Sequence, residues 1–471
     1  MNLQDKTVLV LGMGETGLSM IKWLTRQGAI VRVADSRAVP PNLDAIQRVI
    51  PISQIFTGKF VAKIFSRIDL IAVSPGITLA EPLMQDAVKR GVSVVGDIEL
   101  FAQAIRRLGR SESKILGITG SNGKTTVTAM VGAMAKKAGC DAEVAGNIGP
   151  AALDALMRRE DSGKFPQVWV LELSSFQLET TRSLSPDAAT VLNLCEDHLD
   201  RYVGMPDYVA AKKRIFLSEV NGTQVLNRDD PMVRAMAVPG RKQITFGLGE
   251  PVSENDFGLL HEGGDTWLVQ GRTRLMRTSE LNLIGQHNVV NALAALGLCR
   301  AIELPFGSLL QALREFKGLP HRVEKVATFG GVTFYDDSKG TNVGATVAAL
   351  NGMTQQVVLI AGGDGKGQDF TPLKHSVVER ARAVVLIGRD AKKIEAALAS
   401  CIIPVHQAKT MEEAVQKSFM LAEQGDVVLM SPACASLDMF RNYAHRAEVF
   451  VAAVRDLAAR IPAKIVQGPC Q

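Results

Sequence analysis

Short apolar runs, most of them followed by a polar or glycine-rich turn, recur along the whole chain. Near-continuous runs of this kind predict buried strands of parallel sheets, here at 7–11, 30–34, 69–73, 115–118, 168–173, 190–194, 333–335, 357–361, 383–387 and 427–430. Helices are expected between them, including 18–27, 127–131, 208–216 and one that starts near residue 287. Shorter strands at 223–227 and 266–269 suggest a small antiparallel patch. Alternating strands and helices predict an α/β fold with ligand sites at the carboxyl edges of its sheets.

A chain of 471 residues is too long for one core, and three domains are expected. The polar stretch 106–113 reads as a linker, and Gly318 and Pro320 end a helix. These signals divide the chain into an N-terminal Rossmann-like domain (1–106), a central α/β domain (107–317) and a C-terminal Rossmann-like domain with a parallel sheet (318–471).

The segment TGSNGKTT, residues 119–126, follows one predicted strand and precedes a helix. This arrangement holds nucleotide phosphates, because backbone N–H groups and the helix N-terminus face the anion. Lys124 supplies a charge, and Thr125 can bind Mg²⁺. The usual GxxxxGK[ST] loop needs glycine at position 118, where this chain has Ile118, so the loop is a shortened TGxxGK[ST] variant. It predicts an ATP site formed by Gly117, Ile118, Thr119, Gly120, Ser121, Asn122, Gly123, Lys124, Thr125 and Thr126.

A second glycine-rich turn, Gly12-Met13-Gly14-Glu15-Thr16-Gly17, follows the first predicted strand. With Asp35 about twenty residues later it matches the dinucleotide fingerprint. One such motif fits a structural turn about as well as a ligand loop. In either case the loop that begins at Ser74 lies at the same sheet edge, where a phosphate-bearing ligand is plausible.

The composition excludes several classes of function. Apolar residues make up 46% and charged residues 21%, as in ordinary globular proteins. Lys and Arg exceed Asp and Glu by 53 − 48 = 5 without a basic run, and aromatics are only 5%, so a nucleic-acid track is not expected. No signal pattern or membrane-length apolar run is present. Six cysteines without metal spacing (140, 195, 299, 401, 434 and 470) suggest reduced thiols in the cytoplasm.

Several polar residues have two interpretations. Glu172, inside an apolar strand, is either a Mg²⁺ ligand together with Thr125 or a carboxylate satisfied by nearby hydroxyls. His198 is either at the site edge or an ordinary surface histidine. Sequence spacing does not distinguish a functional Lys212 or Lys213 from solvated side chains. Asn288 and Asn291 lie at the start of a predicted helix, where their side chains have two interpretations: they hydrogen-bond a nucleobase, or they cap the helix.

The third domain places charged groups at successive strand ends. Any one of these groups could be an ordinary surface charge, but five at one sheet edge are suited to binding ATP phosphates and a small zwitterion. They are Arg322, Asp337, Lys339, Asp364 and Lys366.

With these residues identified, the chain closely resembles the Mur ligases, the ATP-dependent amide-forming enzymes of peptidoglycan synthesis. The resemblance covers all three domains, and its motifs occur in order: TGSNGKTT (119–126), GNIG (146–149), LELSSFQLE (171–179), EDHLDRY (196–202), YVAAKKRIF (208–216), GQHNVVNALAA (285–295), GLPHRVE (318–324), DDSKGTN (336–342), GGDGKGQDF (362–370) and SPACASLDMF (431–440). The last four and the compact first domain are most similar to the branch that adds D-glutamate.

The resemblance implies a role for each matching residue. Thr16, Ser36, Arg37 and Ser74 would contact the UDP part of UDP-N-acetylmuramoyl-L-alanine, and Asn147 and His198 its sugar–peptide part. Two Mg²⁺ ions would be held by Thr125, Glu172, His198 and a carbamylated Lys212. Asn288 or Asn291 would reach adenine, with Arg322 and Asp337 on the nucleotide. D-glutamate would be bound by Lys339, Thr341, Lys366, Ser436 and Tyr443, although the family usually has Phe at the last position.

The implied reaction has two steps: the substrate carboxylate attacks the γ-phosphate of ATP, and the amine of D-glutamate then attacks the acyl phosphate. Catalytic roles fall to Lys124, His198, Lys212, Glu172 and Lys339, in a monomer that binds small molecules but neither nucleic acid nor membrane. Folylpolyglutamate synthases, which share the TGxxGK[ST] loop, are an alternative that the N-terminal GxGxxG domain disfavours. An NAD-dependent dehydrogenase would leave the ATP loop unexplained.

Overall fold

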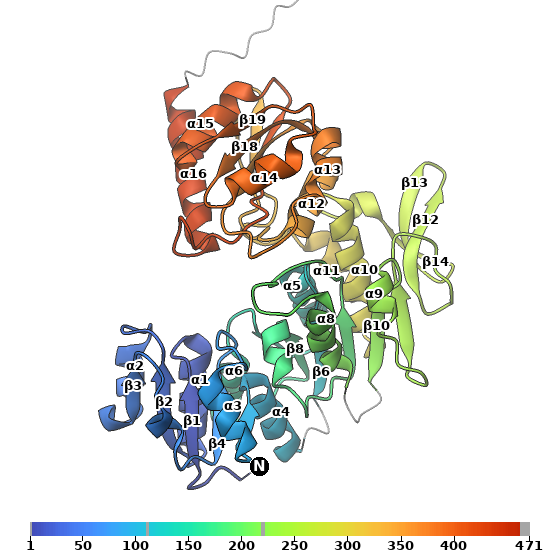
Figure 1. Cartoon of the computed structure of the whole chain (residues 1–471). Coiled ribbons are helices and arrows are strands. Elements are labelled where there is room, and N and C mark those ends of the chain that lie inside the picture. The colour runs from blue at the N-terminus through green and yellow to red at the C-terminus, as the bar shows by residue number, and fades with distance from the viewer. Residues whose placement is uncertain (1, 110–112, 218–221, 462–471) are drawn as a thin grey trace, which may run out of the picture.

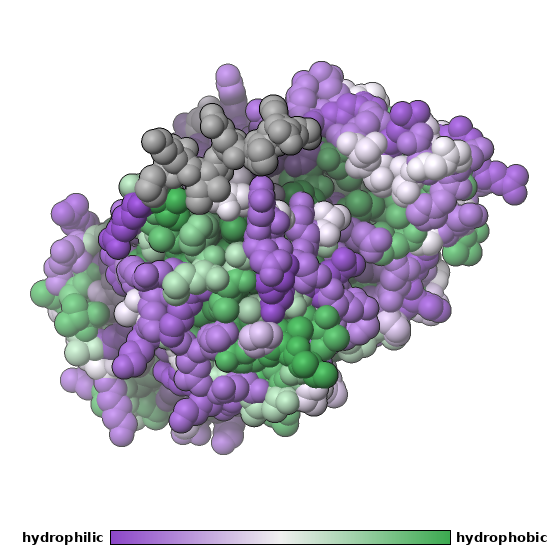
Figure 2. All heavy atoms as spheres, turned by 90° about the horizontal axis from the view of Figure 1, so that it is seen from above, coloured by the Kyte–Doolittle hydropathy of each residue, from purple (hydrophilic) through white to green (hydrophobic). Residues whose placement is uncertain are grey.

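The computed structural model describes residues 2–109, 113–217 and 222–461, whose strands form three sheets (Figure 1). Across these residues no helix has both the length and the apolar character that spanning a membrane requires. The five cysteines in this part of the chain are free thiols, as predicted, and Cys470 lies outside the described residues. Apolar and polar side chains alternate over the face seen from above (Figure 2), as is ordinary for globular proteins.

The N-terminal sheet has five parallel strands in the order β3-β2-β1-β4-β5. The strands are β1 (Thr7–Leu11), β2 (Ile30–Asp35), β3 (Ile55–Thr57), β4 (Leu70–Val73) and β5 (Ser93–Val95), and the helices are α1 (Glu15–Arg26), α2 (Leu43–Gln47), α3 (Pro82–Lys89) and α4 (Asp97–Arg107). The strand order reverses between β1 and β4, so the loops after these strands flank the crevice where such sheets bind ligands. The Rossmann-like prediction is confirmed.

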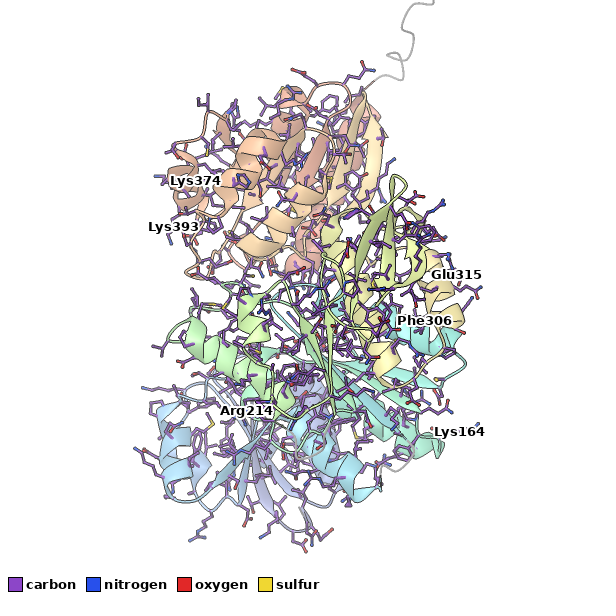
Figure 3. All side chains as sticks on the ribbon, turned by 90° about the vertical axis from the view of Figure 1, so that its right-hand side faces the viewer. Lys164, Arg214, Phe306, Glu315, Lys374 and Lys393 are labelled. Carbon is purple, nitrogen blue, oxygen red and sulfur yellow. The ribbon has the colours of Figure 1, made fainter. Side chains whose placement is uncertain are left out.

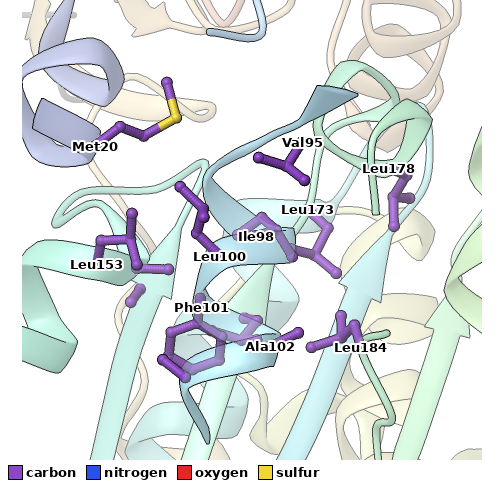
Figure 4. Packing of buried hydrophobic residues seen from close by; sticks show 14 of the residues in the cluster. Met20, Val95, Ile98, Leu100, Phe101, Ala102, Leu153, Leu173, Leu178 and Leu184 are labelled. Atoms are coloured by element: carbon purple, nitrogen blue, oxygen red, sulfur yellow. The ribbon is translucent and has the colours of Figure 1, made fainter. Parts of the chain in front are cut away.

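Helix α4 joins the first sheet to the central one. The predicted linker begins too early, since α4 continues to Arg107, and residues 110–112 of that stretch lie outside the described residues. One apolar cluster runs from the first sheet through α4 into the central domain (Figure 4), and Phe101 meets Trp169 edge-on at 5.1 Å between ring centroids. The first two sheets are therefore packed together rather than tethered by a free linker.

The central sheet has nine strands in the order β14-β13-β12-β11-β10-β9-β6-β8-β7. Its elements are β6 (Lys114–Thr119), β7 (Ala142–Gly146), β8 (Val168–Glu172), β9 (Ala188–Val191), β10 (Thr223–Asn227), β11 (Gln243–Phe246), β12 (Phe257–Glu262), β13 (Asp265–Gln270), β14 (Thr273–Arg277), α5 (Lys124–Lys137), α6 (Ala152–Ser162), α7 (Ser175–Glu179), α8 (Met205–Lys213), α9 (Pro231–Arg234), α10 (Gln286–Ala301) and α11 (Phe306–Glu315). The expected antiparallel patch is only partly right. β10 extends the parallel sheet between β9 and β11, and the antiparallel pairs are β12–β13 and β13–β14.

The third sheet has six strands in the order β15-β16-β20-β17-β18-β19. Its elements are β15 (Glu324–Phe329), β16 (Val332–Asp336), β17 (Val357–Gly362), β18 (Ala381–Ile387), β19 (Val405–Gln407), β20 (Val427–Met430), α12 (Val343–Gly352), α13 (Leu373–Arg380), α14 (Ala391–Leu398), α15 (Met411–Leu421) and α16 (Tyr443–Arg460). Apolar clusters with helices cover both faces, α12–α14 on one and α15 and α16 on the other (Figure 1). The predicted parallel sheet is confirmed, with β15 as an unpredicted antiparallel edge.

Candidate active site

The glycine-rich loop lies between β6 and α5, as the sequence predicts. Gly117, Ile118 and Thr119 end β6, and Lys124, Thr125 and Thr126 begin α5. Gly123 has φ +82°, and a Cβ there would come within 2.5 Å of Asn291 Oδ1. Asn193 fixes the loop: its Oδ1 accepts from Asn122 N (2.8 Å) and its carbonyl from Ser121 N (2.9 Å). These hydrogen bonds fix the shape of the loop backbone.

Residues from the central and third domains surround a cavity of about 560 Å³ in front of this loop. The predicted site residues that line it are Ser121, Asn122, Gly123, Lys124, Thr125, Asn147, Glu172, His198, Lys212, Arg322, Lys339, Thr341, Asp364, Lys366, Ser436 and Tyr443. Side chains that the sequence places in two different domains therefore meet in one space, which we call the central cavity.

A second cavity of about 330 Å³ shares Asn122, Gly123, Arg322 and Lys339 with the first, and we call it the side pocket. Its other lining residues include Thr126, Asn288, Asn291, Leu319, Val323, Asp337 and Ala345. Neither predicted asparagine caps α10, whose N-cap is Gly285 without a side-chain bond. Apolar walls with two amide side chains suit a nucleobase whose phosphates lie on the loop.

Glu172 is buried at the end of β8, and its two oxygens have different surroundings. Oε1 accepts a hydrogen bond from Asn147 Nδ2 (2.7 Å), whereas Oε2 has no hydrogen-bond partner among the described residues. Nearby hydroxyls therefore do not satisfy this carboxylate, contrary to one of the two interpretations of the sequence. A buried carboxylate oxygen without a donor, in a cavity that Thr125 also lines, is chemically suited to a divalent cation.

Two lysines converge on one carbonyl of the loop. Lys124 Nζ donates to Gly120 O (2.9 Å) and Ser121 O (2.9 Å), and Lys212 Nζ donates to the same Gly120 O (2.8 Å). Burial, together with the neighbouring Lys124 charge, holds the pKa of Lys212 well below its usual range. Lys212 is buried in α8 and lines the central cavity, whereas Lys213 is partly exposed and does not. This geometry distinguishes two lysines that sequence spacing does not.

His198 lies in the loop after β9 with φ +57°. Burial lowers its pKa to about 4, so the imidazole is neutral at physiological pH. The preceding Asp197, to which the sequence assigned no role, forms an ion pair with Lys366 of the third domain. Asn342 Nδ2 donates to Asn122 Oδ1 (3.0 Å) and Asp197 Oδ2 (3.3 Å) across the same boundary. Asp197 and Asn342 thus join the two domains. The signal for Asp197 in the sequence was a carboxylate in the loop that follows a parallel strand.

Burial shifts the pKa of two charged groups of the third domain away from their ordinary values. Burial lowers the pKa of Lys339 to about 8, and its Nζ lies 3.8 Å from the centre of the Tyr443 ring. The ring of Tyr443, a position where the resemblance implies Phe, therefore faces a cation. Burial raises the pKa of Asp337 to about 7, and Ser431 Oγ donates to its Oδ2 (2.7 Å).

The predicted residues of the first domain line neither the central cavity nor the side pocket; these are Thr16, Ser36, Arg37 and Ser74. They lie instead at the carboxyl edge of the first sheet. Asp35 accepts from Met13 N (2.7 Å) and from Arg37 Nε (2.8 Å) and Nη2 (2.6 Å). Both oxygens of the acidic residue that a dinucleotide site would use for ribose are therefore engaged within the protein.

Comparison with known proteins decides the family. Three models match in order along the chain: "Mur ligase MurD-like, N-terminal domain" at residues 6–96, "Mur ligase middle domain" at 118–299 and "Mur ligase, glutamate ligase domain" at 321–434. A protein of Nitrosospira multiformis named UDP-N-acetylmuramoylalanine–D-glutamate ligase is 67% identical over 98% of this chain and 97% of its own length. The chain belongs to the Mur ligase family. A relative of the same name from Nitrosomonas europaea is 63% identical, with 97% of each chain covered.

Solved structures of other Mur ligases share the fold. MurF from Acinetobacter baumannii has a TM-score of 0.60 at 16% identity and covers 96% of this chain and 91% of its own. UDP-N-acetylmuramate-alanine ligase MurC from Thermotoga maritima has a TM-score of 0.59 at 18% identity, with 96% and 100% covered. The three-domain α/β fold expected from the sequence is therefore confirmed.

Proposed function

We propose that the chain is an ATP-dependent ligase that joins D-glutamate to UDP-N-acetylmuramoyl-L-alanine in peptidoglycan precursor synthesis. The observation that carries the proposal is the central cavity, where a phosphate loop, a carboxylate suited to a cation and the lysines of the third domain meet. The names of the relatives at 67% and 63% identity describe the same reaction. We place this activity in the cytoplasm and assign it to a monomer.

Each domain receives one part of the substrates. Residues 1–106 take the UDP group at the crevice between β1 and β4, with Thr16, Ser36, Arg37 and Ser74 in contact with it. Residues 107–317 hold ATP, whose adenine occupies the side pocket beside Asn288 or Asn291. Residues 318–471 hold D-glutamate and complete the nucleotide site with Arg322 and Asp337.

In the first step, the alanine carboxylate of the UDP-linked substrate attacks the γ-phosphate, and ADP leaves. Both reactants are anions, so the residues around them must offset the repulsion. Lys124 and Arg322 supply fixed positive charge, and Asn147 and the neutral His198 orient the sugar–peptide part. Asn193 accepts from the backbone N–H groups of Ser121 and Asn122 and so holds the loop in place, which leaves the later N–H groups, at the start of α5, to face the phosphates.

Magnesium fits the residues present. Glu172 Oε2 is buried without a partner among the described residues, and Thr125 lies in the same cavity. We propose that these two residues hold one Mg²⁺, and that His198 and a modified Lys212 hold or orient a second. Bound there, Mg²⁺ would neutralise phosphate charge in the transition state.

In the second step, the neutral amine of D-glutamate attacks the acyl phosphate, the amide bond forms and phosphate leaves. Lys339, Thr341, Lys366, Ser436 and Tyr443 position the amino acid. Lys366 now contacts Asp197, so D-glutamate would either replace that partner or share it.

The surroundings of Lys212 support the carbamylation that we propose. A lowered pKa increases the neutral fraction of the amine, which is the form that reacts with CO₂. The carbamate would turn a second cation beside Lys124 into an anion, which removes the repulsion at Gly120 O and creates a ligand for a metal.

The proposal is tested by supplying ATP, Mg²⁺, UDP-N-acetylmuramoyl-L-alanine and D-glutamate, and measuring product mass together with ADP. One ADP and one added glutamyl residue per turnover are expected. L-glutamate should give no product, and NADH and folate should not bind. Amide formation with L-glutamate on a folate would instead indicate the folylpolyglutamate synthase reaction.

A further inference from the structure

Arg201 is a cation of the central domain whose hydrogen bonds reach the first domain. It lies in the loop after β9, three residues beyond His198, and its side chain is only 15% exposed. Nη2 donates to Ile77 O (2.8 Å) and Nη1 to Pro75 O (3.3 Å). These carbonyls belong to the loop that follows β4 and begins with Ser74. One guanidinium thus holds the proposed UDP-binding loop against the loop that carries His198.

The same guanidinium contacts an aromatic ring that leads to His198. Its carbon atom lies 4.6 Å from the centre of the Phe176 ring, and Phe176 meets the His198 ring edge-on at 4.7 Å between centroids. Glu179 Oε2, 3.5 Å from Nη2, adds a distant ion pair. Arg201 therefore connects three elements: the loop after β4, helix α7 and the His198 loop.

We propose that Arg201 is a positioning residue that couples recognition of the uridine nucleotide to the placement of the substrate carboxylate at the γ-phosphate. The inference rests on the proposed function. The UDP group is bound in one domain and the carboxylate reacts in another, so the angle between the two domains decides where the carboxylate lies. A displacement of about 1 Å at a reacting centre costs up to a hundredfold in rate.

Planar geometry explains why arginine suits this position. A guanidinium can donate two parallel hydrogen bonds to neighbouring carbonyls while its face lies on an aromatic ring. Lysine keeps the charge and can reach one carbonyl, but it cannot hold both and also stack. Arg214, which bonds Leu178 O and Thr181 O nearby, lies at the same domain junction (Figure 3), but both of its partners belong to the central domain. Of these two arginines, only Arg201 donates hydrogen bonds to carbonyls of the first domain.

The experiment compares Arg201→Met and Arg201→Lys with wild type and with Arg234→Met, which removes an exposed arginine at the end of α9. UDP alone probes the first domain, and ADP alone probes the glycine-rich loop. We expect Arg201→Met to bind both within about twofold of wild type while kcat for the full UDP-linked substrate falls at least about tenfold. Arg201→Lys should be intermediate, and Arg234→Met should match wild type.

A second comparison separates positioning from a purely structural role. In an Arg37→Ala background the UDP group is held less firmly, so replacing Arg201 should reduce kcat/KM by a smaller factor than in wild type. Multiplicative effects of the two substitutions would overturn the proposal, as would an unchanged kcat or a loss of UDP affinity equal to the loss of rate. The wild-type rate measured in parallel tests the ligase assignment itself, so failure of that assignment is distinguishable from failure of the Arg201 role.

Discussion

Replacement of Lys124 by methionine tests the charge arrangement of the glycine-rich loop. At about 4 Å, a lysine and a phosphate charge interact by roughly 4 kcal/mol at an effective dielectric constant of ~20. Loss of that interaction in the transition state corresponds to a factor of about a thousand in rate. Removing one donor of this kind from other enzymes costs about a hundred- to a thousandfold. We therefore expect kcat for Lys124→Met to fall by about two to three orders of magnitude.

The structure also indicates how Lys124→Met will affect the stability of the fold. The loop carbonyl of Gly120 keeps a donor from Lys212, while Ser121 O loses its lysine partner. Against this loss, the neighbouring cations Lys212 and Arg322 no longer face a third charge. The two effects oppose each other, and we expect Tm to change by no more than about 2–4 °C, the shift that ~1 kcal/mol produces in a domain of roughly 150–250 residues.

Phosphate release and chemical trapping of the acyl phosphate are the assays for this variant. Both should fall together, because Lys124 acts before the amine attacks. Trapped intermediate at wild-type levels with slow amide formation would place Lys124 in the second step. Near-normal turnover would show that the phosphates do not lie on this loop.

Three further outcomes follow from the site. Arg37→Ala should raise KM for the UDP-linked substrate at least severalfold and leave KM for ATP and D-glutamate nearly unchanged. Steady-state kinetics with each substrate varied in turn measure this, and an equal rise in KM for ATP would refute the UDP assignment. Lys212→Ala should lose activity, acetate should restore part of it and Lys213→Ala should be nearly silent; a high-resolution map of active, metal-bound enzyme with a bare amine at Lys212 would contradict carbamylation. Burial lowers the pKa of Lys339 to about 8, so its positive charge is present below that pH and lost above it. KM for D-glutamate should therefore rise as the pH passes about 8, and Lys339→Arg, which stays charged, should abolish that rise.

Local signals in the sequence predicted much of the fold. Both glycine-rich turns were found because strand, turn and helix are adjacent in the chain, and β1, β6 and β20 lie where the apolar runs predicted them. Strand pairing is not local, which is why β10 was assigned to an antiparallel patch. Its parallel partners β9 and β11 are separated from it by segments that contain α8 and α9, and the apolar pattern of the strands does not reveal which of them pair.

The site residues divide in the same way. Lys124 and Glu172 were found because each interrupts a pattern, one in a glycine-rich turn and one in an apolar strand. Asp197 and Arg201 were missed because their partners, Lys366 and the loop at 75–77, are more than a hundred positions away. Their contacts cross domain boundaries, and a single sequence contains no pattern that pairs such residues.

The central claim is that the substrate carboxylate attacks the γ-phosphate, and an oxygen label tests it most directly. UDP-N-acetylmuramoyl-L-alanine carrying ¹⁸O in both carboxylate oxygens is turned over with ATP and D-glutamate, and the released phosphate is analysed by mass. One labelled oxygen should appear in every phosphate, because the carboxylate oxygen that attacks phosphorus leaves with it when the amine forms the amide. Phosphate without label, formed alongside the amide product, would contradict the acyl-phosphate mechanism.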